Sequence, residues 1–459
     1  MKASNFLTCV RIAGYLSAGS LVVPVVQATT VPNEERQVTF SAKNHVLDNN
    51  DNFSHAGRFL CYDTRETFGP GLGNSRSVEM VEIATGKETV LYEAKQFLSG
   101  ARAAPGIAAV SFSPVEDKVI FIHGPPLEEV PARGFYGIAN RQGAEVAADG
   151  NGVLKWLDKR DADATRDTIP GAHRGGTHRH EYSVDGKRVG FTYDDFLLTQ
   201  YDRTVGFMEQ NPKAPPPALC YFALLVPVVP RGTAKPGEIE RAQGDSWVGQ
   251  RGLMRAFIGK VREADGTYQE SLFVVDVPAS VDITTADSGS PTRFPTPPQG
   301  VSIRRLTHTR AAGTVRGTMA GDRIAYYGDG ADGKSQIFII SSDGSDQDPS
   351  PAKRPVQATH LPKGAGPGLR WRPSGNSIVC TSNGGVVATR VQAGPDFGRS
   401  VFLTPEGDGP AREHLVISPD GKLVAYGRAR PTKDNGGKAF KAYNGSDPLQ
   451  IFVCPFSDP

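Results

Sequence analysis

The sequence predicts an all-β protein, a seven-bladed β-propeller that is closed by an N-terminal strand. Three observations favour this fold: a short motif recurs seven times, the copies are spaced for four strands each, and a segment near the start of the chain fits the one strand that the last unit lacks. The chain of 459 residues holds 52 glycines and 35 prolines, which indicates many turns. With 38% hydrophobic and 22% charged residues, we expect it to be globular.

Each copy of the motif has an aromatic or aliphatic residue, a small polar residue, a turn with Gly or Asp, and then an alternating apolar strand. The clearest copy is Ile417–Gly421 (Ile-Ser-Pro-Asp-Gly), which leads into the strand Leu423–Tyr426. The weakest is at Gly249. The seven copies start at Phe53, Phe112, Tyr182, Gly249, Met319, Trp371 and Ile417. Their turns are roughly 46 to 69 residues apart, which fits a four-stranded blade with loops of variable length.

Each motif joins the first two antiparallel strands of a blade. A third strand follows, for example at 77–82 and 336–340, and a fourth carries a Leu-Thr pair, as at 306–307. The last blade reaches its third strand at 450–454, and we expect Arg36–Phe40, which resembles a fourth strand, to complete it. Such closure would leave no open sheet edge between the first and last blades. A β-sandwich or two separate β domains would explain neither the seven copies nor the displaced strand.

The first 28 residues are typical of an export signal. Lys2 and Arg11 flank the start of the short apolar run Ile12–Val26, and the small-residue pattern Val26–Ala28 follows. We expect cleavage near Thr29, a single propeller domain over residues 29–459, and a secreted or periplasmic protein. A retained anchor is the alternative, but the run is shorter than the roughly 20 residues that span a bilayer. We expect no membrane span in the rest of the chain.

The charge balance excludes some partners. The chain has 51 basic and 49 acidic residues, so we expect neither nucleic acid nor an anionic membrane surface as a partner. We expect a monomer. The cysteines show no zinc-binding spacing, and buried thiols and disulfides remain equal alternatives for the four that lie outside the leader. These four are Cys61, Cys220, Cys380 and Cys454.

On its repeats, the chain resembles the TolB-like propellers, whose short repeat reads Ser-Pro-Asp-Gly before an apolar strand, as at 418–421. The segment Gly175–Ser183 resembles a bacterial family of exported propellers of unassigned function. It is also faintly similar to oligogalacturonate lyases and other propeller polysaccharide lyases. In those enzymes, a His-x-His pair on an inner strand serves metal binding or catalysis. Where the lyase pattern has Gln, this chain has Gly175.

We expect the functional site at one mouth of the propeller, where the loops that lead into the first strands meet the loops between the second and third strands. These loops bring together acids, histidines and arginines that are scattered along the chain. The residues concerned are Asp51, Asp63, Arg65, His123, His173, His178, His180, Asp194, Asp195, Arg316, Arg370 and His414.

His178 and His180 form the strongest local feature. They are two residues apart, so in an extended strand their side chains would leave on the same side and could share one ligand. A divalent metal, Mn or Ca, would need further ligands, for which His173 and Asp194 are candidates. Alternatively, both histidines are polar residues satisfied by neighbouring carbonyl groups.

The resemblance and the histidines suggest a lyase that acts by β-elimination on an acidic oligosaccharide or polysaccharide. Such a site needs a base with a pKa near the working pH, a cation that stabilises the enediolate, and a proton donor for the leaving oxygen. The candidates are His178 or His180 as the base, Arg65, Arg316 or Arg370 as a bidentate clamp, and His123, His414 or Tyr136 as the donor.

Two other functions stay open. A non-catalytic TolB-like module could recognise a protein or glycan at the same mouth, because the fold alone does not determine function. A glycoside hydrolase would need two facing carboxyl groups, such as those of Asp63 and Asp194.

Overall fold

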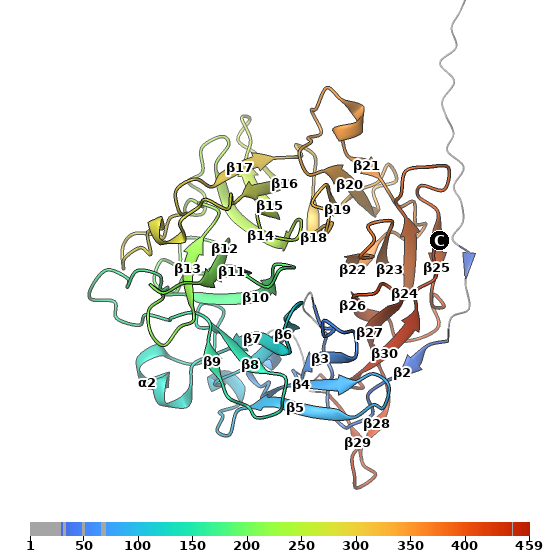
Figure 1. The fold of residues 1–459 in the computed structure, drawn as a ribbon, viewed down its shortest axis with the longest axis horizontal. Coiled ribbons are helices and arrows are strands. Elements are labelled where there is room, and N and C mark those ends of the chain that lie inside the picture. The colour runs from blue at the N-terminus through green and yellow to red at the C-terminus, as the bar shows by residue number, and fades with distance from the viewer. Residues whose placement is uncertain (1–28, 31–33, 48–50, 66–69, 443) are drawn as a thin grey trace, which may run out of the picture.

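The computed structural model describes residues 29–30, 34–47, 51–65, 70–442 and 444–459. It shows seven β-sheets arranged as blades around a common axis, which confirms the predicted propeller (Figure 1). The predicted signal peptide, residues 1–28, lies outside the described residues. None of the described helices is long and apolar enough to cross a membrane.

The strands of each blade follow one another from the axis outward. In blade 1, the bridges Val46–Asp63 and Phe53–Leu60 pair an inner segment with the first full strand. The strands of blade 1 are β3 (Phe59–Asp63), β4 (Ser77–Glu82) and β5 (Glu88–Glu93); those of blade 2 are β6 (Ile107–Phe112), β7 (Lys118–His123), β8 (Gln142–Ala147) and β9 (Lys155–Trp156); and those of blade 3 are β10 (Gly176–Tyr182), β11 (Arg188–Asp194), β12 (Thr204–Gln210) and β13 (Cys220–Leu224).

Blades 4 to 7 repeat this pattern. Their strands are β14 (Ile239–Trp247), β15 (Met254–Arg262), β16 (Tyr268–Asp276) and β17 (Ser302–Arg305); β18 (Ala312–Gly317), β19 (Arg323–Asp329), β20 (Ser335–Ser341) and β21 (Val356–Gln357); β22 (Gly366–Trp371), β23 (Ser377–Ser382), β24 (Gly385–Arg390) and β25 (Ser400–Phe402); and β26 (Arg412–Ile417), β27 (Leu423–Ala429), β30 (Leu449–Pro455) and β2 (Arg36–Gln37).

The remaining elements lie between or beside the blades. They are β1 (Thr29–Thr30), which pairs in parallel with β25, the hairpin of β28 (Thr432–Lys433) and β29 (Ala439–Phe440), the short helices α1 (Pro70–Gly73) and α2 (Val130–Arg133), and the 3₁₀ turns η1 (Gly100–Arg102), η2 (Leu127–Glu129), η3 (Ile283–Thr285) and η4 (Pro351–Lys353). The four cysteines Cys61, Cys220, Cys380 and Cys454 are buried free thiols.

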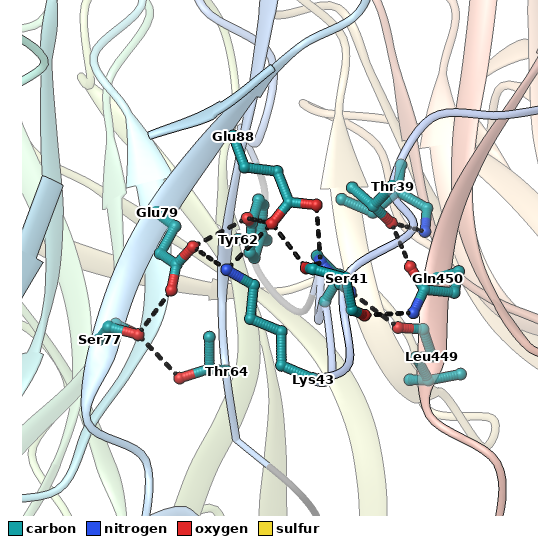
Figure 2. A network of polar contacts seen from close by, with 12 residues as sticks. Thr39, Ser41, Lys43, Tyr62, Thr64, Ser77, Glu79, Glu88, Leu449 and Gln450 are labelled. Atoms are coloured by element: carbon teal, nitrogen blue, oxygen red, sulfur yellow. Dashed lines mark hydrogen bonds and ion pairs between the residues drawn. The ribbon is translucent and has the colours of Figure 1, made fainter. Parts of the chain in front are cut away.

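The N-terminal strand closes the ring, as predicted. β2 pairs with β30 and lies beside it in Figure 1, and the pairing is extended by a bond from the Val38 amide to the Ile451 carbonyl, 2.8 Å. Thr39 then donates from its hydroxyl to Gln450 Oε1, 2.8 Å (Figure 2). The chain therefore supplies the fourth strand of blade 7 from its opposite end.

The segment after β2 also ties the last blade to the first (Figure 2). Ser41 donates to Glu88, 2.7 Å, and the Lys43 ammonium lies 2.5 Å from Glu79 and 2.9 Å from Glu88. Burial alone would raise the pKa of Glu88, but hydrogen bonds from His45, Ser41 and Lys43 lower it well below its usual range. These contacts bridge the seam between blades 7 and 1.

Replacing Glu35 by alanine should lower the thermal midpoint by several degrees. The Glu35 carboxylate accepts bonds from Arg412 at 2.7 and 2.8 Å, Tyr426 at 2.7 Å and Arg428 at 2.9 Å. Arg412 is only 2% exposed, and although Asp408 remains paired with it, losing the charge-assisted bonds of Glu35 should cost about 2 kcal/mol. Thermal unfolding of Glu35→Ala and of Glu34→Ala, an exposed neighbour, provides the comparison.

The stabilisation provided by Glu35 depends on pH. Bonds to Arg412 and Tyr426 outweigh the effect of burial and lower the pKa of Glu35. The stabilisation is therefore complete above the ordinary carboxylate pKa and is lost as the pH falls through the lowered value. Equal midpoints for the two variants at neutral pH would contradict the role of Glu35 in closure.

Candidate functional site

The inner strands share an irregularity that brings side chains to the axis of the ring. In each of β6, β10, β14, β18, β22 and β26, the pairing with the next strand shifts, at two points in β14 and at one point in each of the others. At or near the shift, one residue has a φ between 57° and 95°. These residues are Ala109, Arg179, Gly244, Gly313, Gly368 and His414. Glycine adopts such a φ readily, whereas Arg179 and His414 do so at a cost in conformational energy. Both of these residues line the same cavity near the axis.

Two cavities lie along the axis. The first, about 280 Å³, lies on the side of the motif turns, and Asp51 and Glu181 line it. The second, about 500 Å³, lies on the side where the inner strands begin, and Arg179 lines it. Arg316 and Arg370 line both, so the two guanidinium groups lie between the cavities. The aromatic residues of the first cavity are Phe53, Tyr182, Trp247 and Trp371.

Arg316 is a buried cation near the axis. It is 6% exposed and, as far as the chain is described, donates only to backbone carbonyls, those of Leu369 at 3.3 Å and Val315 at 3.4 Å. Within the described part of the chain, no carboxylate lies within 4 Å of its guanidinium. Burial, and then the positive charge of Arg370, lower the pKa of Arg316 well below its usual range. The charges of Glu181 and Asp51 oppose this shift only in part, so a bound anion would further stabilise the charged form.

The two acids of the first cavity differ in their surroundings. Glu181 is compensated, because it accepts from Ser246 at 2.8 Å and lies 3.0 Å from the Arg255 guanidinium. The Asp51 side chain faces the first cavity, where it is solvent-accessible, and protein atoms enclose it on its other sides. Burial and the nearby Glu181 charge raise the pKa of Asp51 to about 7, against the opposing effect of Arg316 and Arg370. Near neutral pH this carboxyl group can therefore exchange a proton.

The sequence predicted some of the charged residues that line the two axial cavities. Asp51, Arg316 and Arg370 were predicted site residues and lie together, but Glu181 and Arg179 were missed. A signal was present for Glu181, since it stands directly before the motif residue Tyr182, as Arg370 stands directly before Trp371. His414, also predicted, lines the second cavity with Arg179.

The expectation that His178 and His180 leave β10 on the same side is wrong. The strand bulges between His178 and Glu181, and Arg179 has a φ of 57°. The His178 ring lies 2.8 Å from the Thr192 hydroxyl, whereas the His180 ring lies 3.1 Å from that of Thr177. Since Thr177 and His178 are adjacent and alternate across the sheet, the two imidazoles lie on opposite faces and do not share a ligand.

The predicted metal ligands are divided in the same way. His173 lies 3.3 Å from Asp158, which accepts from Thr177 on the face of His180. Asp194 lies 3.8 Å from His178 on the other face and is paired with Arg203 at 3.0 Å. The described residues contain no group of three or more His, Cys, Asp or Glu placed to hold a metal ion. The four residues as predicted, His173, His178, His180 and Asp194, therefore do not fit one Mn or Ca site.

Burial also keeps these histidines neutral. His178 and His180 are 5% and 0% exposed. Burial, and then the charges of Arg203 and Arg141, lower the pKa of His178 well below its usual range, and burial lowers the pKa of His180 to about 4.

The remaining predicted residues have structural contacts. His123 bonds the Gly124 carbonyl at 2.6 Å and the Tyr92 hydroxyl at 3.2 Å, and burial lowers its pKa to about 4. Arg65 forms two 2.6 Å bonds to Asp63, which also accepts from the Ala109 amide and so holds the bulge of β6. Because Asp63 and Asp194 are each paired with an arginine, neither is the uncommitted carboxyl group that glycoside hydrolysis requires.

The chain is similar in sequence to proteins of unassigned function. A family model described as a protein of unknown function (DUF3748) matches residues 106–214. The uncharacterized protein YidR of Escherichia coli (strain K12) is 30% identical over 425 residues, which cover 85% of this chain and 94% of that protein.

Among solved structures, the putative TolB of Agrobacterium tumefaciens matches with 13% identity and a TM-score of 0.38, over 83% of this chain and 99% of that chain. An oligogalacturonate lyase in complex with manganese matches with 10% identity and a TM-score of 0.39, over 94% and 99% of the two chains. At these identities the likeness is one of fold alone.

Proposed function

This chain belongs to the family of the uncharacterized protein YidR, and we propose that its axial channel binds an acidic saccharide through the carboxylate of a uronate residue. The observation that carries the proposal is Arg316, a buried guanidinium that lines both axial cavities and whose hydrogen-bond partners in the described part of the chain are backbone carbonyls. Arg370 lines the same two cavities, so a carboxylate bound there would lie near two guanidinium groups. Aromatic side chains in the first cavity offer apolar surface to a sugar ring.

We propose further that this site performs β-elimination. Asp51, whose pKa is about 7, removes the proton next to the uronate carboxylate, and the released electron pair forms a double bond as the glycosidic C–O bond on the neighbouring carbon breaks. Arg316 and Arg370 stabilise the enediolate that forms on the carboxylate. His414, which lines the second cavity, is the candidate that protonates the departing oxygen.

Asp51 takes the role that the sequence suggested for His178 or His180. Those two imidazoles are buried and lie on opposite faces of β10, whereas Asp51 faces a cavity. In this proposal, His123 and Arg65 support the loops that surround the channel. Binding without catalysis is the second candidate function, and the burial of the predicted catalytic histidines favours it.

The test is a panel of uronate-bearing polysaccharides and oligosaccharides, with ultraviolet absorbance of the unsaturated product and calorimetric binding measured side by side. A rise in absorbance supports the lyase. Binding without a rise supports the binding module, and neither signal with a folded protein overturns the proposal.

We also propose that residues 1–28 direct export and are removed, which leaves residues 29–459 as one domain in the periplasm or outside the cell. N-terminal sequencing of protein from the periplasmic fraction should begin near Thr29. Recovery of the full-length chain from the cytoplasm alone would contradict export.

A further inference from the structure

A second uncompensated cation lies away from the axis, on the loops of blade 2. Arg141, directly before β8, is 6% exposed. Its guanidinium lies over the Tyr136 ring, 5.0 Å from the ring centroid. The Arg141 side chain makes no hydrogen bond or ion pair within the described residues, and its Nε is buried. A buried guanidinium in this state is costly unless an anion is bound.

Close packing holds Tyr136 in place beside Arg141. Its ring occupies a slot between Gly73, Gly106 and Gly124, where an added Cβ would lie 3.1, 2.5 and 2.7 Å from ring atoms. Any larger residue at Gly106 or Gly124 would therefore collide with the ring. The Tyr136 hydroxyl is buried and has no hydrogen-bond partner in the described structure. The chain thus positions a second donor next to Arg141 and leaves it unused.

The charges around Arg141 do not neutralise it. Arg65 is paired with Asp63 at 2.6 Å, and Arg203 with Asp194 at 3.0 Å. Among the described residues, Asp63 and Asp194 are therefore each matched by another arginine, and the charge of Arg141 is left over. The surroundings attract an anion and offer it two donors.

Tyr136 lies on the same face of the ring as the second axial cavity. Tyr136 packs against Gly106 and Gly124, which flank the start of β6 and the end of β7. This is the face of the ring on which the second axial cavity lies, because the inner strands begin there. Besides burial, the charges of Arg141 and Arg179 both lower the pKa of His178, and Arg179 lines that cavity.

We propose that Arg141 and Tyr136 form a second anion-binding site, which takes a further carboxylate of the same acidic saccharide. The identity of the ligand rests on the proposed function, whereas the anion site rests on the two buried donors alone. The ligand is then an oligomer with at least two uronate units, one at Arg316 in the channel and one at Arg141 on the mouth face.

The first test compares galacturonate with oligogalacturonate by titration calorimetry. Arg141→Met should weaken oligomer binding by tenfold or more and leave the affinity of the monomer for the Arg316 site unchanged, and Tyr136→Phe should weaken oligomer binding severalfold. Arg102→Met, an exposed arginine on the loop before β6, serves as the matched control and should change neither. Oligomer affinity within twofold of wild type in Arg141→Met would overturn the proposal.

A structural role for Arg141 is separated by thermal unfolding without ligand. Arg141→Met removes an uncompensated buried charge, so its midpoint should equal or exceed that of wild type. A fall of several degrees would assign Arg141 a structural role and overturn the proposal.

The second test does not depend on saccharides and uses sulfate as the probe. In an Arg316→Met background, sulfate should still raise the thermal midpoint, and adding Arg141→Met should remove most of that rise. If the rise survives in the double variant, the anion site is wrong. If wild type binds no uronate but the sulfate effect depends on Arg141, the proposed function fails and the anion site stands.

Discussion

Replacing Arg316 by methionine should weaken the binding of a uronate oligosaccharide by thirtyfold or more. Arg316 lies between the two axial cavities and has no carboxylate within 4 Å among the described residues, so a bound uronate would supply an anion in direct contact with its guanidinium. Loss of one partner of a buried charge pair costs about 2 kcal/mol or more in binding, which corresponds to that factor. Titration calorimetry with the oligosaccharide measures the change.

Three comparisons make this result specific to Arg316. Arg316→Lys keeps the charge but loses the planar fork, so its affinity should fall between those of methionine and wild type. Arg310→Met removes an exposed arginine of the same blade that is paired with Asp329, and should bind like wild type. Without ligand, Arg316→Met should unfold at a midpoint no lower than wild type, because an unpaired buried charge is lost. Unchanged affinity in Arg316→Met would place the ligand elsewhere.

Replacing Asp51 by asparagine should abolish elimination while the saccharide still binds. Removal of a general base typically lowers the rate by about 10²- to 10⁴-fold, and the amide keeps the shape of the side chain. The rate of the wild-type protein should rise with pH and level off above about pH 7, because Asp51 must be deprotonated and its pKa is about 7. Initial rates across pH 5 to about 9 measure both effects, with the exposed Asp434→Asn as the control.

The stability of Asp51→Asn provides an independent check. In the folded protein, burial and Glu181 raise the pKa of Asp51 from 3.8 to about 7, so the folded state holds this proton more tightly than the unfolded state. The contribution of Asp51 to stability is therefore complete below about pH 4 and is lost as the pH rises through 7. Relative to wild type, Asp51→Asn should gain stability over that interval. A constant difference between the two proteins would show that the pKa of Asp51 is not raised.

The sequence was sufficient for the fold because propeller blades depend on local patterns. Alternating apolar residues form the strands, and the motif turns set the spacing of the blades. Even the closure by Arg36–Phe40 could be predicted, since a strand signature stood at the start of the chain while the last blade lacked one. The structure pairs Arg36 and Gln37 with Val453 and Phe452.

The candidate site could be predicted only in part. Asp51, Arg316 and Arg370 were among the predicted site residues, but the structure places both arginines within β18 and β22, and Asp51 lines the cavity on the side of the motif turns. The pair His178 and His180 was misread, because one bulge at Arg179 reverses the alternation of β10. A bulge of this kind leaves no mark in the pattern of residue types, since here it falls on an arginine rather than a glycine.

By itself, therefore, the sequence determined the architecture of this protein: seven blades, their order, and the N-terminal strand that joins the last blade to the first. Only the tertiary structure decided which charged residues act together. The charge of Arg65 is neutralised by Asp63, while Arg316 and Arg141 lie buried without a carboxylate among the described residues. The physical reason is that strand patterns depend on neighbours in the chain, whereas compensation of a charge depends on distances between blades far apart in sequence.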